Sequence, residues 1–229
     1  MKIIQTKNGL RLSQHGVVIS EMRLTRGPTH SVFDVLAALI AVFNPQGRIG
    51  VLGFAGGGMM APLRKLGVDS TIHAVDLDAT GFDLFDRHCK GWAGDVRWKR
   101  AEASAWLAKQ PGSFDLIVED LSVPTNGDVF KPSISWESLP GLIQQRLAPS
   151  GTGIFNLLKP ANGRWNPGLR RILRLFPSAR FVRLDEFENL ILVVGNRLPD
   201  ARTLSANLRR QLRDLRSRQA GRVHVSARS

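Results

Sequence analysis

A glycine-rich loop and an acid that follows it stand at a spacing suited to binding a nucleoside. The apolar run 49–52 leads into the loop 53–58, which reads Gly-Phe-Ala-Gly-Gly-Gly. Glycines let the backbone approach a ligand closely, and free N–H groups at a following helix start can donate hydrogen bonds. Asp76 ends the next apolar run, where a carboxylate about 20 residues after the glycines can accept both ribose hydroxyls. The loop alone could be a tight strand-to-helix turn, so Asp76 is what favours a nucleoside.

Two further acids follow apolar runs in the same way. Glu102 comes after residues 96–100, where it could accept a hydrogen bond from an adenine amino group. Its alternative role is that of a carboxylate at the start of the helix that includes Ser104. Asp120 ends the run 114–119. Because the carboxyl ends of parallel strands meet at one edge of a sheet, we expect the acids to share one site there.

The elements that must position these residues alternate between strand and helix. Strands are expected at 48–53, 71–75, 96–100, 114–119, 153–158, 180–185 and 190–195, and helices at 29–43, 60–66, 79–90, 104–109, 135–146 and 167–176. Single helices between strands imply parallel pairing, whereas the last two strands are close enough to form a hairpin with one antiparallel member. We therefore predict an α/β, Rossmann-like class I methyltransferase fold with a mostly parallel seven-stranded sheet and a small N-terminal β appendage.

The chain divides into three parts. Residues 1–29 form a small β-hairpin region, with turn signals at Asn8-Gly9 and His15-Gly16. Residues 30–198 form the main domain, and residues 199–229 a basic C-terminal helix and tail. The tail carries leucines at helical spacing, which we expect to dock on the domain or on a partner subunit: Leu204, Leu208, Leu212 and Leu215.

Composition and charge restrict the classes of function. The formal net charge is +13, but the segment 197–229 holds nine arginines against two aspartates, so the rest of the chain is only mildly basic. Nucleic-acid binding through the tail is a less favoured alternative, because no aromatic-basic single-strand motif accompanies it. A lone cysteine excludes an intramolecular disulfide and a cysteine-rich zinc site. We expect a cytoplasmic protein with no metal, no secretory signal and no membrane segment.

Four short motifs together resemble the spermidine synthase family of polyamine aminopropyltransferases, over residues 10–196. They are the loop 51–58, the pair Asp76 and Asp78, the Ala-Glu-Ala segment around Glu102, and the strand that ends at Asp120. The resemblance implies a role in polyamine biosynthesis, with decarboxylated S-adenosylmethionine or S-adenosylmethionine as donor, a small-molecule amine as acceptor, and a homodimer. It places the donor's ribose at Asp76 and its adenine near Glu102, and makes Asp120 the catalytic acid that orients and deprotonates the amine.

The resemblance also implies a wider set of contacts. Cofactor contacts would come from Gly53, Gly56, Gly57, Gly58, Asp76, Leu77, Glu102, Ala103 and Asp120, and substrate contacts from His30 and Ser122. The chain departs from the family at Gly58 and Val123, where the family carries aspartates, and it has no tyrosine for the polyamine channel. His30 could take the place of one tyrosine.

Two other hypotheses about the function remain open. A methyltransferase that uses S-adenosylmethionine itself is favoured by the missing acid at Gly58, because less negative charge there tolerates the carboxylate of that donor. A non-catalytic basic protein that binds a nucleoside or nucleic acid is favoured by the tail. The segment from Asn156 to Trp165, which contains Lys159-Pro160 after the fifth expected strand, is a candidate wall of the site.

Overall fold

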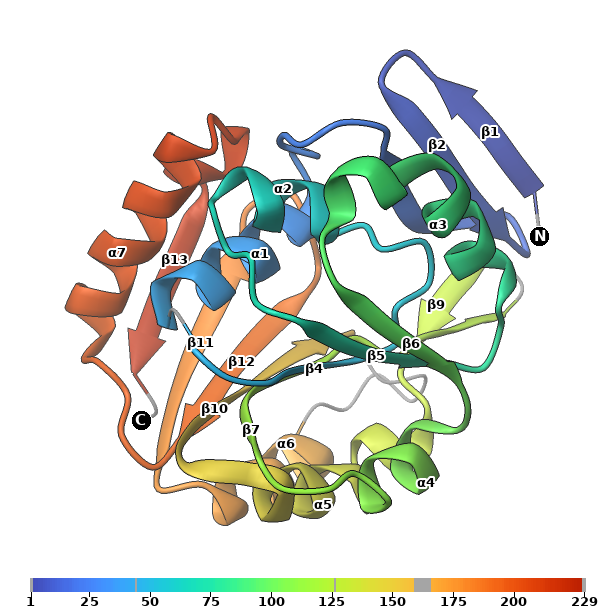
Figure 1. Cartoon of the computed structure of the whole chain (residues 1–229). Helices are drawn as coiled ribbons and strands as arrows, with labels where there is room; N and C mark the ends of the chain where they lie inside the picture. Colours follow the sequence, from blue (N-terminus) through green and yellow to red (C-terminus); the bar gives the residue numbers. More distant parts are fainter. Residues whose placement is uncertain (1, 44, 126, 159–165, 228–229) are drawn as a thin grey trace.

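The computed structural model describes residues 2–43, 45–125, 127–158 and 166–227 (Figure 1). Its centre is an eight-stranded sheet whose strands follow the order β13 (Val223–Ala227), β11 (Ser178–Leu184), β12 (Leu190–Gly195), β10 (Leu147–Leu157), β7 (Phe114–Glu119), β4 (Ile49–Leu52), β5 (Ile72–Asp76) and β6 (Val96–Arg100). The five strands from β10 to β6 pair in parallel. The middle strands are continuous apolar runs because helices bury both of their faces.

Helices cover the two faces of this sheet in separate groups (Figure 1). On one face lie α1 (Val32–Phe43), α2 (Met60–Lys65), α3 (Thr80–Ala93) and α7 (Ala201–Asp214). On the other lie α4 (Ala103–Ala108), α5 (Leu139–Arg146) and α6 (Asn166–Leu175). No described helix is long and apolar enough to cross a membrane.

All seven strands predicted for the sheet are present, and so is the antiparallel hairpin. Strand β12 is its antiparallel member, because it inserts between β10 and β11 and pairs antiparallel with both. The eighth strand, β13, was not predicted. It pairs antiparallel with β11 and comes from the segment that we assigned to a helical tail. Its alternation of Val223 and Val225 with polar residues spans only five residues, too short to stand out in an arginine-rich segment.

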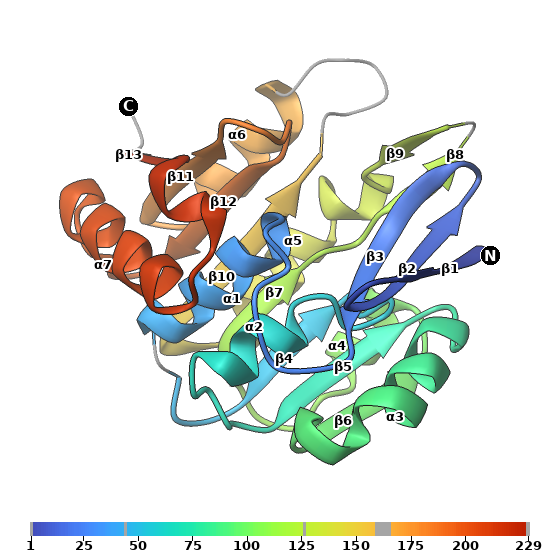
Figure 2. The same cartoon turned by 90° about the horizontal axis from the view of Figure 1, so that it is seen from above.

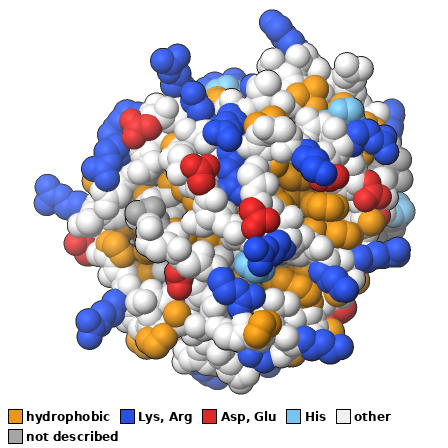
Figure 3. All heavy atoms as spheres, in the orientation of Figure 1, with side chains coloured by type: hydrophobic (Ala, Val, Ile, Leu, Met, Phe, Trp, Pro, Cys, Tyr) orange, Lys and Arg blue, Asp and Glu red, His pale blue; other side chains and the backbone are white. Residues whose placement is uncertain are grey.

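The leucine stripe of α7 docks on the domain itself. Leu204, Leu208 and Leu212 are fully buried in the same core cluster as α1, and Leu215 is nearly so. The stripe is therefore used within the chain and offers no surface to a partner subunit. The homodimer stays a prediction, as do nucleic-acid binding and a cytoplasmic location. Basic side chains on the face seen in Figure 3 are scattered among acidic ones and do not gather into one patch.

The N-terminal appendage is a three-stranded antiparallel sheet of β1 (Lys2–Thr6), β2 (Gly9–Gln14) and β3 (Val17–Arg23), turning where the sequence indicated. It rests on the main domain through Leu12 and Met22, which belong to the main core. Beside it lies a hairpin that was not predicted, β8 (Val123–Thr125) and β9 (Asp128–Phe130), followed by the 3-10 turn η1 (Ser133–Ser135). The Gly127 N–H donates to the carbonyl of His15 at 3.0 Å, so the two hairpins touch (Figure 2).

Candidate functional site

A cavity of about 800 Å³ lies over the carboxyl ends of the parallel strands. Its floor comes from the glycine loop and from the segments that follow β5, β6, β7 and β10. The N-terminal sheet, the hairpin β8–β9, the segment 29–33 and the tail form its walls. Such an edge is where sheets of this type bind ligands.

The glycine loop brings the ends of β4 and β7 into contact. Gly53 has φ +89°, and a Cβ there would lie 2.6 Å from the carbonyl oxygen of Asp120. Gly53 and Gly58 line the cavity, whereas Gly56 and Gly57 do not. A Cβ on Gly56 would meet Leu12 of the N-terminal sheet at 3.2 Å, and Gly57 is enclosed by aromatic rings. These two glycines therefore allow the loop to pack against its neighbours on the side that faces away from the cavity.

Asp76 lines the cavity in a fixed orientation. Its Oδ2 accepts a hydrogen bond of 2.7 Å from the Ala55 N–H of the glycine loop, and Oδ1 accepts one of 3.2 Å from the Asp78 N–H. The adjacent Leu77 is 66% exposed at the cavity, an unusual position for a large apolar side chain. Asp78 instead accepts hydrogen bonds from Thr80 at the start of α3, which hold the pKa of its carboxyl below the usual value.

Glu102 is the N-cap of α4. Its carboxylate accepts hydrogen bonds from the backbone N–H groups of Ser104 and Ala105 at 2.9 and 2.7 Å. Burial alone would raise the pKa of Glu102, but these hydrogen bonds outweigh it and lower the pKa. Glu102 and Ala103 line the cavity beside Leu77. The capping role that the sequence left open is present, and it holds the carboxylate at the cavity edge.

Asp120 lies on the cavity floor at the end of β7. Its Oδ1 accepts a hydrogen bond of 2.7 Å from Asn156, whose own Oδ1 accepts one of 2.9 Å from Asn189. Burial raises the pKa of Asp120 to about 6, while the Lys131 ammonium and the Asn156 hydrogen bond oppose the rise. Ser122 lines the cavity two residues further along the chain. Asp120 is thus a carboxyl group able to gain or lose a proton near neutral pH.

A buried ion pair lies directly beneath Asp120. The Lys131 ammonium is 2.9 Å from the Glu119 carboxylate, and both side chains are fully buried. The Ser135 hydroxyl and the Leu121 N–H also donate to Glu119, and Lys131 donates to the Leu121 carbonyl at 2.7 Å. The pair therefore ties the turn after β7 to the segment that follows β9. The sequence does not indicate this pair, because no pattern connects Glu119 to a lysine in an irregular segment.

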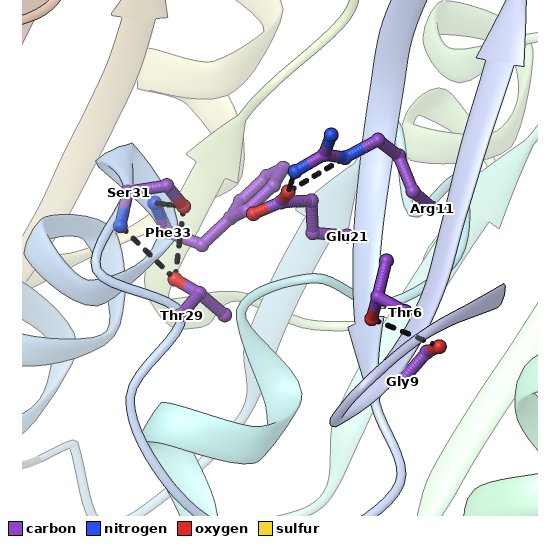
Figure 4. A network of polar contacts seen from close by, with 7 residues as sticks. All are labelled: Thr6, Gly9, Arg11, Glu21, Thr29, Ser31 and Phe33. Atoms are coloured by element: carbon purple, nitrogen blue, oxygen red, sulfur yellow. Dashed lines mark hydrogen bonds and ion pairs between the residues drawn. The ribbon is translucent and has the colours of Figure 1, made fainter. Parts of the chain in front are cut away.

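The segment before α1 forms the wall that includes His30. Asp34 is fully buried and accepts hydrogen bonds from the backbone N–H groups of Thr29 and His30 at 2.7 and 2.9 Å. His30 has φ +62° and lines the cavity. Figure 4 shows Thr29, Ser31 and Phe33 of this segment opposite Arg11 and Glu21 of the N-terminal sheet, whose side chains form an ion pair.

Neither a protein-family model nor a curated protein sequence matches the chain. Solved structures do. A probable spermidine synthase from Corynebacterium glutamicum matches with a TM-score of 0.76 at 17% identity, over 99% of this chain and 86% of that one. Human methyltransferase-like protein 13, in complex with SAH, matches with 0.64 at 21% identity, over 82% and 92%. Spermidine synthase from Thermotoga maritima matches with 0.64 at 13% identity, over 87% and 73%. These likenesses establish the Rossmann-like class I methyltransferase fold.

The structure brings most of the expected residues to one cavity: Gly53, Gly58, Asp76, Leu77, Glu102, Ala103, Asp120, His30 and Ser122 all line it. Lys159-Pro160 lies outside the described residues. Cys89 is fully buried, and burial raises the pKa of its thiol to about 12, which disfavours the thiolate that a nucleophile requires. Asn156, which begins the segment expected as a wall, lines the cavity. Besides Glu119 and Lys131, the residues that the sequence did not indicate are Asn189 and Arg218.

The ion pair under Asp120 predicts a specific pattern of stabilities. Lys131→Met leaves the Glu119 carboxylate buried without its partner and should lower the free energy of unfolding by about 3 to 5 kcal/mol. A double variant, Glu119→Leu with Lys131→Met, removes both charges and should recover most of that loss. Urea unfolding measures all three proteins. A single variant as stable as the parent would contradict the structural role of the pair.

The raised pKa of Asp120 predicts a pH-dependent stability. The folded state holds the proton up to about pH 6, above the ordinary range of an aspartate, so the free energy of unfolding should fall as pH rises from about 4 to about 6. Asp120→Asn removes this cost and should be more stable than the parent by about 1 to 3 kcal/mol at pH 8, with no difference near pH 4. Asp83→Asn, on the exposed side of α3, is the matched control in urea unfolding at both pH values. A variant less stable than the parent at pH 8 would show that the charged carboxylate is stabilised on balance.

Proposed function

We propose that the protein is a transferase that binds an S-adenosylmethionine-type nucleoside and transfers an alkyl group from its sulfonium to an amine. One observation carries the proposal: Asp76 and Asp120 line a single cavity on either side of the glycine loop, and burial raises the pKa of Asp120 to about 6. The Asp76 carboxylate can accept hydrogen bonds from ribose hydroxyls, and the Asp120 carboxylate can accept a proton.

The adenosine would lie over the ends of β5 and β6. Asp76 accepts the ribose hydroxyls, held in place by the loop N–H of Ala55. Leu77 offers exposed apolar surface to the adenine, and the Glu102–Ala103 corner closes its edge. The sulfonium would then lie beside Gly53 and Asp120. The SAH bound in methyltransferase-like protein 13, which shares the fold, supports a nucleoside of this class.

Asp120 would activate the acceptor. An alkylammonium has no lone pair, so it cannot attack a sulfonium carbon until a base removes a proton. Asp120 takes that proton, the amine nitrogen forms its bond to the carbon, and the carbon–sulfur bond breaks to leave a neutral thioether. Burial keeps the carboxyl pKa near 6, which makes Asp120 a better base than an ordinary aspartate while it is still largely charged at pH 7.

Aminopropyl transfer is the reaction we favour. Its support is the resemblance of the loop, Asp76, Glu102 and Asp120 to the spermidine synthases, together with the similarity to the probable spermidine synthase over 99% of this chain.

Methyl transfer from S-adenosylmethionine is the second candidate, and one observation favours it. A Cβ on Gly58 would lie 2.7 Å from the Phe33 ring, so the place of the family's aspartate is filled by an aromatic side chain. No acid there can hold the ammonium of an aminopropyl donor.

The nucleoside assignment predicts that methylthioadenosine binds to the protein. Asp76→Ala should weaken its affinity by about 10- to 100-fold, because a charge-assisted hydrogen-bond acceptor is lost. Asp86→Ala, an exposed acid on α3 outside the cavity, is the matched control and should leave affinity unchanged. Calorimetry with the three proteins is the test, and an absence of binding to the parent protein would refute the proposed function.

The role of Asp120 predicts a selective loss of rate. Asp120→Asn keeps the shape of the side chain but removes the base, so amine transfer should fall by about 10²- to 10⁴-fold while methylthioadenosine affinity changes little. In the parent protein the rate should rise with pH around a midpoint near 6, as the carboxyl loses its proton. Turnover is measured with each sulfonium donor in separate assays. Undiminished transfer by a folded, nucleoside-binding variant would show that another group is the base.

A further inference from the structure

The segment after α7 returns to the cavity and completes its wall. The chain leaves α7 through Arg216, at φ +59°, and enters the 3-10 turn η2 (Arg218–Gly221) before pairing as β13. Gln219 is fully buried, and its Nε2 donates to the His30 carbonyl at 3.0 Å and to Glu186 at 3.1 Å. The Arg218 N–H donates to His30 Nδ1 at 3.4 Å. This docking makes Arg218 a lining residue of the cavity.

Two arginines, Arg218 and Arg222, act on one carboxylate at this corner, that of Glu186. Glu186 forms its ion pair with Arg222, and Glu21 forms its ion pair with Arg11. Within the described residues, Arg218 makes no ion pair. From Asp120 toward the tail, the described lining offers no carboxylate. It offers instead the amides of Asn156 and Asn189, the Phe187 ring and Arg218. An exposed guanidinium in a cavity is a ready partner for an anion, and its planar fork fits a carboxylate best.

The position of Arg218 relative to the strands tells which part of a ligand would reach it. Across the sheet edge, Glu102 follows β6, Asp76 ends β5, Asp120 follows β7 and Asn156 lies on β10, in that spatial order. Arg218 lies beyond Asn156, on the side of Asp120 away from Glu102 and Leu77. It therefore faces the part of the ligands that is not the adenosine.

We propose that Arg218 binds a carboxylate carried by one of the two reactants, and that the tail thereby selects an amino-acid-type ligand over its decarboxylated counterpart. The inference rests on the proposed function and deepens it. The carboxylate belongs either to an amine acceptor that is itself an amino acid, which is compatible with aminopropyl transfer, or to the donor S-adenosylmethionine, which would make methyl transfer the reaction. In both cases the recognising chemistry is the same.

Two pairs of probes separate these sources, since the members of each pair differ only by the carboxylate. The first pair is S-adenosylmethionine and its decarboxylated form. The second pair is ornithine and 1,4-diaminobutane, measured both alone and with methylthioadenosine saturating. Calorimetry is performed on the parent protein, on Arg218→Gln and on the conservative Arg218→Lys. Arg213→Gln is the matched control, because it removes the same charge from an exposed position of α7 outside the cavity.

In at least one pair, the parent and Arg213→Gln should bind the carboxylate-bearing member about tenfold or more tightly than its partner. Arg218→Gln should abolish that preference, Arg218→Lys should restore part of it, and melting temperatures should remain unchanged. If Arg218→Gln loses the preference within the first pair, the carboxylate belongs to the donor. If it loses the preference within the second pair, the carboxylate belongs to the acceptor. The proposal is overturned if the parent shows no preference in either pair, or if the preference survives in Arg218→Gln. Failure of every nucleoside to bind would instead refute the proposed function, while ornithine and 1,4-diaminobutane alone still test Arg218.

Discussion

The backbone of Gly53 passes so close to the Asp120 carbonyl that no side chain can stand between them. This contact sets the geometry of the whole site. The Asp120 N–H donates to the Leu52 carbonyl at 2.8 Å, so the ends of β4 and β7 remain joined where the strands diverge. The loop that leaves Gly53 then reaches Asp76, which accepts from the Ala55 N–H. A side chain at position 53 would push these strand ends apart and separate the two carboxylates.

The acids around the cavity have divided roles because their surroundings differ. Glu119 is neutralised by Lys131, and Glu102 and Asp78 accept hydrogen bonds at helix starts. Each of these carboxylates accepts hydrogen bonds from backbone N–H groups. Among the described residues, Asp120 accepts a side-chain hydrogen bond from Asn156 alone, and its burial on the cavity floor dominates and raises its pKa. In the proposed reaction, Asp120 is the group that its surroundings leave incompletely compensated, and it would accept the proton of the amine.

The sequence predicted the parts of the fold that depend on local patterns. Apolar runs predicted the central strands. The acids at the ends of β5, β6 and β7 were then predicted as well, because each stands next to its strand in the sequence. The hairpin β8–β9 and strand β13 were not found, since each is held by tertiary contacts and is only three to five residues long. A related reason explains why the sequence did not indicate Lys131, Asn189 and Arg218. Their positions depend on contacts with residues far away in the chain, and the hydrophobic periodicity of one segment contains no information about such contacts.

The docking of Gln219 on His30 joins residues that are 189 positions apart in the chain. Ribosomal synthesis delivers His30, the glycine loop and Asp120 long before Gln219 emerges. The nascent polypeptide can therefore form the adenosine half of the cavity while its opposite wall is still missing. Local βα units close shorter loops, so we expect them to form first. Substrate selection through Arg218 would accordingly be acquired last, after α7 has packed its leucines into the core that it shares with α1.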